Sequence, residues 1–142
     1  MKKYLCFALL VICLILAACT NSDESPKQNQ NSEKGETIMY TKITAAEAKR
    51  IMDSGEEYIL LDAREQDEFD EWHIPGAILI PYTEIKAQAE AKLTDKDAQI
   101  LVYCRSGRRS KIAAEALSEL GYTNVKEFGG IIDWPYETES SN

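Results

Sequence analysis

The fold is decided by one stretch of the chain, Ile100-Leu101-Val102-Tyr103-Cys104-Arg105-Ser106-Gly107-Arg108-Arg109-Ser110. Its first four residues are apolar, which is typical of a strand that is buried on both faces of a sheet. Downstream, apolar residues recur at the spacing of one helix face: Ala113, Ala116, Leu117 and Leu120. The stretch therefore predicts a buried strand, a short loop that begins with a cysteine, and an amphipathic helix that Gly121 ends.

The same alternation of short apolar runs and helical segments extends from Thr37 to about Glu137. Thr44 and Glu47 have the spacing of a capping box at a helix start. We expect further strands at residues 58–61, 77–80 and 125–128, and helices at 45–54, 65–72 and 82–93. The segment 65–72 is acidic and is predicted to be a solvated helix that buries its two aromatic rings. The pattern as a whole predicts an α/β fold.

Composition limits the classes of function. A chain of 142 residues accommodates one small domain. Its 24 acidic side chains outnumber 16 Lys and Arg, which argues against a general nucleic-acid binder. The four cysteines, Cys6, Cys13, Cys19 and Cys104, lack the spacing of a disulfide framework. With a single histidine, the chain offers no Cys/His zinc cluster, and we expect neither a metal nor another cofactor.

Residues 1–18 have the pattern of a secretory signal peptide, in which Lys2 and Lys3 precede an apolar run that is short for a membrane span. Leu16-Ala17-Ala18-Cys19 resembles the bacterial lipobox, which predicts cleavage before Cys19 and lipidation of that cysteine. The alternatives are a signal peptide cleaved elsewhere and an uncleaved anchor. Cleavage before Cys19 would leave 14 basic against 24 acidic side chains, and the net charge would change from −8 to −10.

The rest of the chain divides by composition. Residues 19–36 lack large apolar side chains after Cys19, so we expect a lipidated cysteine followed by a disordered tether. A globular domain is predicted at residues 37–137 and a disordered tail at 138–142. This organisation predicts a location in the cell envelope, where a lipid anchor holds the domain at the outer face of a bacterial membrane.

Cys104 lies between a buried strand and the start of a helix, where backbone amides favour negative charge. Arg105, Arg108 and Arg109 add positive charge nearby. Both features should lower the thiol pKa, and the thiolate is the nucleophile in cysteine chemistry. The alternative is a small apolar residue at a strand end, which needs neither arginines nor an anion-binding loop. We therefore interpret Cys104 as a nucleophile.

Four short motifs resemble those of the single-domain rhodanese family of sulfurtransferases. They are Asp62-Ala63-Arg64, His73-Ile74-Pro75-Gly76-Ala77, the loop Cys104-Arg105-Ser106-Gly107-Arg108-Arg109 with the pattern Cys-Arg-x-Gly-x-Arg, and Gly129-Gly130 followed by Trp134. The resemblance implies a three-layer α/β fold with a central five-stranded parallel sheet and helices on both faces. It also implies that Cys104 carries sulfur as a persulfide.

The resemblance further implies roles for residues outside the loop. Asp62 and Arg64 would organise the Cys104 loop rather than react. His73 would have a structural role in its turn, although it is the only histidine in the chain. Gly130 and Trp134 would serve turns and packing.

The expected reaction is sulfane sulfur transfer. The Cys104 thiolate attacks the outer sulfur of thiosulfate or another persulfide, and a thiol, cyanide or protein acceptor then takes that sulfur. Backbone amides of the loop would cradle the persulfide charge, and the residues concerned are Arg105, Ser106, Gly107, Arg108, Arg109 and Ser110. We expect Arg105 and Arg109 to bind the donor or stabilise charge, whereas Arg108 either joins them or is solvated.

Two other functions stay open. A cysteine phosphatase or arsenate reductase has the pattern Cys-x-x-x-x-x-Arg, but Ser110 occupies the arginine position and Arg109 comes one residue early. A membrane-tethered, non-catalytic rhodanese-like module could bind a partner or sense persulfide. Pure binding, however, would need neither Cys104 nor the basic loop.

Overall fold

The computed structural model describes residues 40–141 of the chain. The predicted signal peptide, the lipidation site at Cys19 and the tether lie outside the described residues. Over the described range, every helix is too short or too polar to cross a membrane.

Five strands and four α-helices alternate along the described residues. The sequence predicts four of these strands and all four helices, but it does not predict the two-residue strand at 41–42. The strands are β1 (Thr41–Lys42), β2 (Ile59–Asp62), β3 (Ile78–Leu79), β4 (Ile100–Cys104) and β5 (Val125–Gly130). The helices are α1 (Ala45–Asp53), α2 (Gln66–Glu71), α3 (Ile85–Lys92) and α4 (Arg108–Glu119), and a 3-10 turn, η1 (Ile131–Asp133), follows β5. The predicted capping box of Thr44 and Glu47 starts α1.

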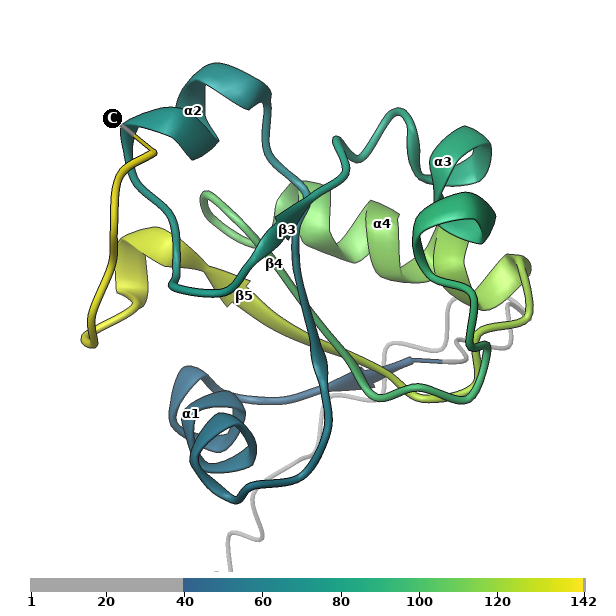
Figure 1. Cartoon of the computed structure of the whole chain (residues 1–142), viewed down its shortest axis with the longest axis horizontal. Helices are drawn as coiled ribbons and strands as arrows, with labels where there is room; N and C mark the ends of the chain where they lie inside the picture. The colour runs from purple at the N-terminus through teal and green to yellow at the C-terminus, as the bar shows by residue number, and fades with distance from the viewer. Residues whose placement is uncertain (1–39, 142) are drawn as a thin grey trace, which may run out of the picture. The chain divides into compact units, whose positions relative to one another are not determined.

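All five strands pair in parallel, in the order β1-β5-β4-β2-β3 (Figure 1). This order confirms the predicted five-stranded parallel sheet. Strand β4 is central, and all five of its residues are buried, as its continuous apolar run requires. Because the strands run in one direction, the residues that end β2, β4 and β5 meet at one edge of the sheet. These residues are Asp62, Cys104 and Gly130.

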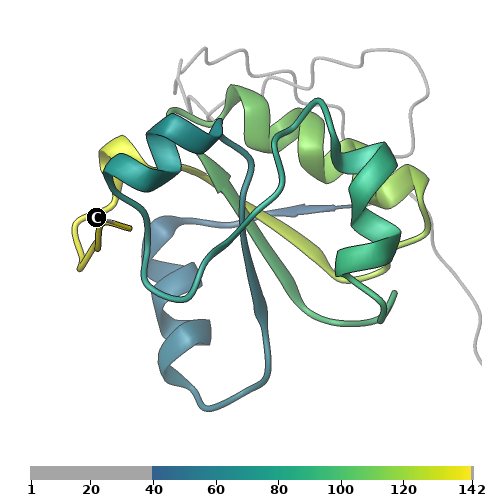
Figure 2. The same ribbon diagram turned by 45° about the horizontal axis from the view of Figure 1, so that its top comes forward.

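The sheet separates two apolar layers, and helices cover both of its faces (Figure 2). Helices α3 and α4 pack with Leu61 and Val102 on one face. Helix α1 and the turn η1 pack with Leu60 and Leu101 on the other. Neighbouring residues serve opposite layers because side chains alternate along a strand. The three-layer arrangement is therefore confirmed.

Several boundaries differ from the prediction. Strand β5 runs on through both glycines to Gly130, and α3 begins only at Ile85 because a turn occupies residues 82–84. The two aromatic rings near α2, Phe69 and Trp72, are half-buried rather than buried.

The predicted disorder of the tail at 138–142 is wrong for residues 138–141. His73 and Glu139 exchange two backbone hydrogen bonds of 2.7 and 2.8 Å in an antiparallel bridge. The amide of Ser141 also donates to the carbonyl oxygen of Asp70 at 3.1 Å. Polar composition alone suggested disorder, but the tail gains backbone partners from a segment almost seventy residues away in sequence.

Candidate active site

Cys104 ends β4 and opens a tight loop that leads into α4. Its side chain is only 1% exposed. The loop turns back toward the sulfur at Gly107, whose φ of 100° lies in the left-handed region that favours glycine. The Gly107 amide donates a hydrogen bond to Sγ of Cys104 at 3.1 Å. The thiol therefore faces backbone N–H groups at the start of a helix.

Two opposing effects act on the pKa of the Cys104 thiol. Burial raises that pKa, because a thiolate loses solvation in the protein interior. The Ser110 hydroxyl and the amides of Ser110, Gly107 and Ser106 lower the pKa, and together they outweigh burial. The thiol pKa is consequently lowered from its usual 9.0. A larger thiolate fraction at neutral pH makes Cys104 a better candidate nucleophile.

The end of β5 forms the floor beneath the Cys104 loop. A Cβ on Gly130 would lie 2.3 Å from the carbonyl oxygen of Arg105 and 2.5 Å from the Cα of Ser106, so the site has room only for glycine. The loop is also tied to η1, since the Ile132 amide donates to the Arg105 carbonyl at 3.2 Å. Gly130 thus positions the loop directly.

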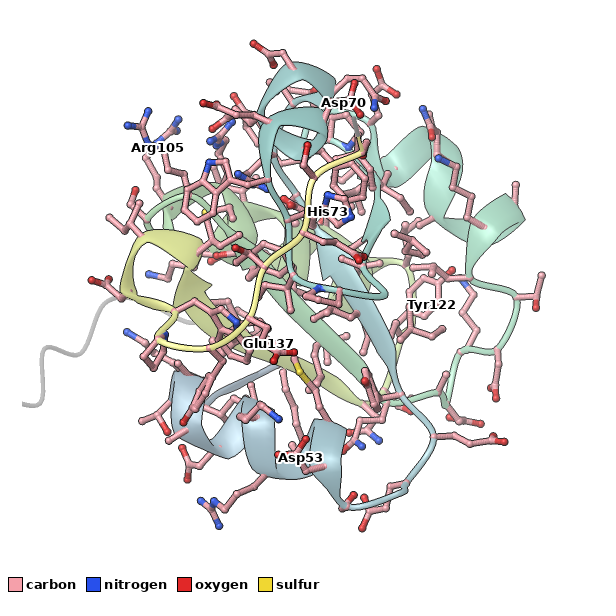
Figure 3. The ribbon with its side chains drawn as sticks, turned by 60° about the vertical axis from the view of Figure 1, so that its left-hand side comes forward. Asp53, Asp70, His73, Arg105, Tyr122 and Glu137 are labelled. Atoms are coloured by element: carbon pink, nitrogen blue, oxygen red, sulfur yellow. The ribbon has the colours of Figure 1, made fainter. Side chains whose placement is uncertain are left out.

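The three loop arginines differ in their surroundings. Arg109 is bound by Glu68 of α2, with Nη2 to Oε1 at 2.7 Å and Nη1 to Oε2 at 2.5 Å. Arg105 is exposed and extends outward from the domain (Figure 3). Arg108 is also exposed, and its guanidinium lies 5.9 Å from the ring centre of Tyr82. Arg105 and Arg109, which the sequence predicts to share donor binding, therefore differ: Arg109 is paired with a carboxylate, whereas Arg105 is exposed to solvent.

The partner of Arg109 changes the interpretation of α2. Its acidic run was predicted to be a solvated face, but the Glu68 side chain is only 23% exposed. The hydrogen bond from Arg109 lowers the pKa of Glu68 and outweighs burial, which raises it. Glu68 is therefore ionised at neutral pH and neutralises Arg109 in the first turn of α4.

Asp62 and Arg64 form a buried ion pair at the end of β2. Nη2 of Arg64 lies 2.7 Å from Oδ2 of Asp62 and 2.6 Å from the carbonyl oxygen of Trp72. Both side chains are almost completely shielded from solvent. These contacts tie β2 to the residue that follows α2. The pair thereby positions α2, the helix that carries Glu68.

His73 is buried and held by local partners. Its Nδ1 lies 2.8 Å from the carbonyl oxygen of Phe69, and its Nε2 lies 3.4 Å from Oε1 of Glu139. Its ring stacks on Phe69 at 3.9 Å between centroids. Trp134 packs against Phe128 in the apolar layer below the loop. These contacts are structural.

Glu127 of β5 is a site residue that sequence reasoning missed. Its side chain is buried, and Oε1 accepts hydrogen bonds from the Ser110 hydroxyl at 2.7 Å and from the Gly129 amide at 2.8 Å. A signal was present, because Glu127 is two residues from Val125 and so faces the same apolar layer. An acidic residue at an inward position of a strand is unusual.

Comparison with known proteins agrees with this geometry. The family model named Rhodanese-like domain matches residues 44–135. The chain belongs to the rhodanese-like domain family. Thiosulfate sulfurtransferase PspE of Escherichia coli is 41% identical to this rhodanese-like domain over 73 residues, which is 51% of this chain and 70% of PspE. YtwF of Bacillus subtilis, also named as a sulfurtransferase, is 36% identical over 100 residues, which is 70% of this chain and 95% of YtwF.

Solved structures show the same likeness. A rhodanese from E. coli, solved with anions, superposes on this rhodanese-like domain with a TM-score of 0.56 and 36% identity, covering 59% of this chain and 99% of that one. Together with its relatives, the fold assigns the chain to the rhodanese-type sulfurtransferases.

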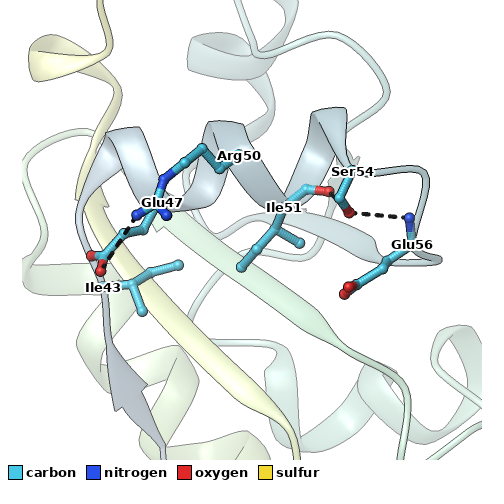
Figure 4. Close-up of a pocket in the computed structure, with 6 residues that line it drawn as sticks. All are labelled: Ile43, Glu47, Arg50, Ile51, Ser54 and Glu56. Carbon is cyan, nitrogen blue, oxygen red and sulfur yellow. Dashed lines mark hydrogen bonds and ion pairs between the residues drawn. The ribbon is translucent and has the colours of Figure 1, made fainter.

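A hollow elsewhere in this rhodanese-like domain carries no comparable chemistry. It has a volume of about 290 Å³ and lies beside α1 (Figure 4). Two of its charged residues serve the helix itself, since Glu47 caps α1 through Thr44 and lies 3.8 Å from Arg50. Among residues 40–141, no group of three or more His, Cys, Asp or Glu side chains could hold a metal ion.

Proposed function

We propose that this domain moves a sulfane sulfur from thiosulfate or a persulfide to a thiophilic acceptor through a persulfide on Cys104. The observation that carries the proposal is a buried thiol of lowered pKa that faces the backbone amides of a tight loop. Such a site holds a nucleophilic sulfur, and its backbone N–H groups can donate hydrogen bonds to the negatively charged outer sulfur of a persulfide.

In the first step, the Cys104 thiolate attacks the outer sulfur of the donor. A new S–S bond forms at Sγ, and the donor's own bond to that sulfur breaks. The leaving sulfite or thiolate takes the electron pair of the broken bond. In the second step, an acceptor thiolate or cyanide attacks the outer sulfur of the persulfide, and Cys104 leaves as a thiolate. Charge is conserved in both steps, so neither an oxidant nor a reductant is required.

The surroundings of the loop bear on which donors fit. The exposed guanidiniums of Arg105 and Arg108 offer positive charge to an anionic donor that approaches from solvent. The charge of Arg109 is already matched by Glu68 at 2.5 to 2.7 Å. A dianionic donor therefore gains less from this site than three loop arginines suggest. We expect persulfide donors of lower charge to compete well with thiosulfate.

The arrangement argues against phosphatase or arsenate reductase activity. Ser110 stands where those enzymes have the phosphate-binding arginine, and it is buried against Glu127. A tetrahedral dianion would also be repelled by a second carboxylate, Glu68, which is hydrogen-bonded to the neighbouring Arg109. A non-catalytic binding or sensing module remains the alternative function, and it predicts no turnover.

The test uses the domain from Thr37 onward, in which Cys104 is the only cysteine. After incubation with thiosulfate or a persulfide, mass spectrometry should find an adduct of one sulfur atom on Cys104 that an added thiol removes. Cys104→Ser should lose the adduct and all sulfur transfer but keep its circular dichroism spectrum. An adduct without turnover would favour the sensing module, and hydrolysis of aryl phosphates without sulfur transfer would refute the proposal.

We also propose that lipid on Cys19 tethers the domain to the outer face of a bacterial membrane. The lipobox-like Leu16-Ala17-Ala18-Cys19 and the polar segment after it support this proposal. In a bacterial host, the full chain should incorporate labelled fatty acid and sediment with membranes, and Cys19→Ala should do neither. Equal labelling of both chains would exclude Cys19 as the anchor.

A further inference from the structure

The site contains a second buried anion that the sulfur transfer steps do not use. Glu127 is 3% exposed and lies under the loop that must stabilise the Cys104 thiolate. Its Oε1 also lies 4.0 Å from the position that a Cβ on Gly107 would occupy. A buried carboxylate beside a developing thiolate opposes ionisation of the thiol, so its presence calls for an explanation.

The contacts of Ser110 supply one. Its hydroxyl lies 2.7 Å from Oε1 of Glu127, 3.0 Å from the carbonyl oxygen of Gly107 and 3.3 Å from that of Gly129. The same hydroxyl contributes to the lowered pKa of the Cys104 thiol, whose sulfur accepts a hydrogen bond from the Gly107 amide at 3.1 Å. A hydroxyl has one proton, so it can donate fully to only one of these acceptors. The charged oxygen at the shortest distance is the strongest competitor.

We propose that Glu127 is a positioning residue that holds the Ser110 proton and thereby limits how strongly Ser110 stabilises the Cys104 thiolate. The inference rests on the proposed function, in which that thiolate is the nucleophile. With Glu127 in place, the loop amides stabilise the thiolate and the Ser110 hydroxyl contributes only in part. The thiol pKa is then lower than usual but higher than the loop would otherwise make it.

This limit has a chemical benefit. The intrinsic nucleophilicity of a thiolate falls as its pKa falls, and the best attacking thiol has a pKa near the ambient pH. A loop with several N–H donors and arginines would lower the pKa of Cys104 beyond that optimum. The Glu127 carboxylate restrains the decrease without blocking access to the sulfur.

Other charged or titratable groups lie near Glu127 and Cys104. Tyr40 lies near Glu127, and the pKa of Tyr40 is raised by burial, by Glu115 and, to a smaller extent, by Glu127. Lys42 is the register partner of Glu127 on β1 and is exposed. Arg109, in the first turn of α4, lies near Cys104 but is paired with Glu68. Among the described residues, Ser110 is the side chain that donates to Glu127, at 2.7 Å, and that also lowers the pKa of the Cys104 thiol.

The experiment measures the rate of Cys104 alkylation by iodoacetamide against pH in the domain from Thr37 onward. Glu127→Gln keeps the size of the side chain and a neutral acceptor, and it should lower the thiol pKa by about one unit, or about tenfold in acid dissociation. In a Ser110→Ala background the same substitution should change acid dissociation by less than about threefold. The matched control is Glu115→Gln, which removes a nearby exposed charge from α4 and should leave the profile unchanged.

Two results would overturn the inference. One is an unchanged profile in Glu127→Gln, which would make the residue purely structural. The other is an equal shift with and without Ser110, which would mean that the carboxylate acts through space. If Glu127→Gln does not fold, Ser110→Ala decides alone. A rise of about one unit in the thiol pKa would then show that Ser110 donates mainly to the sulfur, whereas a smaller change supports Glu127 as its acceptor.

Because alkylation needs no sulfur donor, this outcome is independent of the proposed function. Coupling of Glu127 and Ser110 in a protein that transfers no sulfur would refute the function and leave the inference standing. Sulfur transfer in a protein without that coupling would support the proposed function and refute the inference about Glu127.

Discussion

Replacement of Gly130 by alanine should separate the position of the Cys104 loop from the stability of the domain. Gly130 has an extended backbone, with φ of −119° and ψ of 142°, so alanine adds no backbone strain there. Its Cβ, however, would lie 2.3 Å from the Arg105 carbonyl oxygen and 2.5 Å from the Ser106 Cα, where ordinary contact begins at 3.4 Å. Both opposing atoms belong to backbone, so the loop must retreat by about 1 Å.

The effect on activity follows from that displacement. A shift of about 1 Å in a catalytic group can reduce the rate about 100-fold, which corresponds to about 2.7 kcal/mol of transition-state free energy. Overpacking should also lower the free energy of unfolding by about 1–3 kcal/mol. We expect Gly130→Ala to lose about 100-fold in kcat/KM for sulfur transfer from thiosulfate to cyanide, and its thiol pKa to rise as the amides move away.

The control is Gly121→Ala at the end of α4. Gly121 has a φ of 87° and nothing within 4 Å of its added Cβ, so alanine there costs about 1–2 kcal/mol in backbone strain without a clash. Its kcat/KM should stay near that of the wild type. Activity of Gly130→Ala within threefold of wild type would refute the close-approach argument. An equal loss of activity in both variants would attribute the effect to stability instead.

Three further predictions concern charge and ionisation. The pKa of the Cys104 thiol is lower in the folded state than in the unfolded state. The free energy of unfolding should therefore rise as pH increases from the folded to the unfolded thiol pKa, and this added stability is lost when pH falls below the folded value. Urea titrations across that range should show this rise in the wild type, and its persistence in Cys104→Ala would assign it to another group. Arg64→Met leaves the Asp62 carboxylate buried without its partner, which should lower the free energy of unfolding by about 3–5 kcal/mol. Addition of Asp62→Asn should recover part of that loss, and no recovery would mean that packing rather than charge is responsible. Glu68→Gln removes a largely shielded ion pair and should cost about 1 kcal/mol by thermal melting, whereas Glu119→Gln, whose side chain is 61% exposed, should change stability by less than about 0.5 kcal/mol. Equal effects of the last two would contradict the special place of Glu68.

Much of the fold could be predicted because it depends on local patterns. The apolar run at Ile100–Tyr103 predicted the central strand, since a strand covered on both faces has no polar position. The spacing of Ala113 and Leu117 predicted α4, because residues three and four apart share a helix face. The tail near Glu139 was misjudged, because its order depends on backbone partners beside His73 and not on its own composition.

The candidate site divides in the same way. The placement of the Cys104 thiol beside backbone amides could be predicted, because Cys104 and the residues that follow it are contiguous and their geometry is set by one strand-to-helix loop. The pairing of Arg109 with Glu68 could not, because the two residues are 41 positions apart and meet only when α2 packs beside α4. A run of acidic residues does not indicate which member faces inward.

Local sequence patterns were enough to predict the α/β fold, the cysteine at the end of the central strand and the basic loop that follows it. Each of these depends on residues that are neighbours along the chain. Three relations became visible only in the folded structure: Arg109 pairs with Glu68, Gly130 supports the loop, and the Ser110 hydroxyl donates to Glu127. These relations join different strands and helices, and their energies depend on distances and burial that exist only after the sheet has formed.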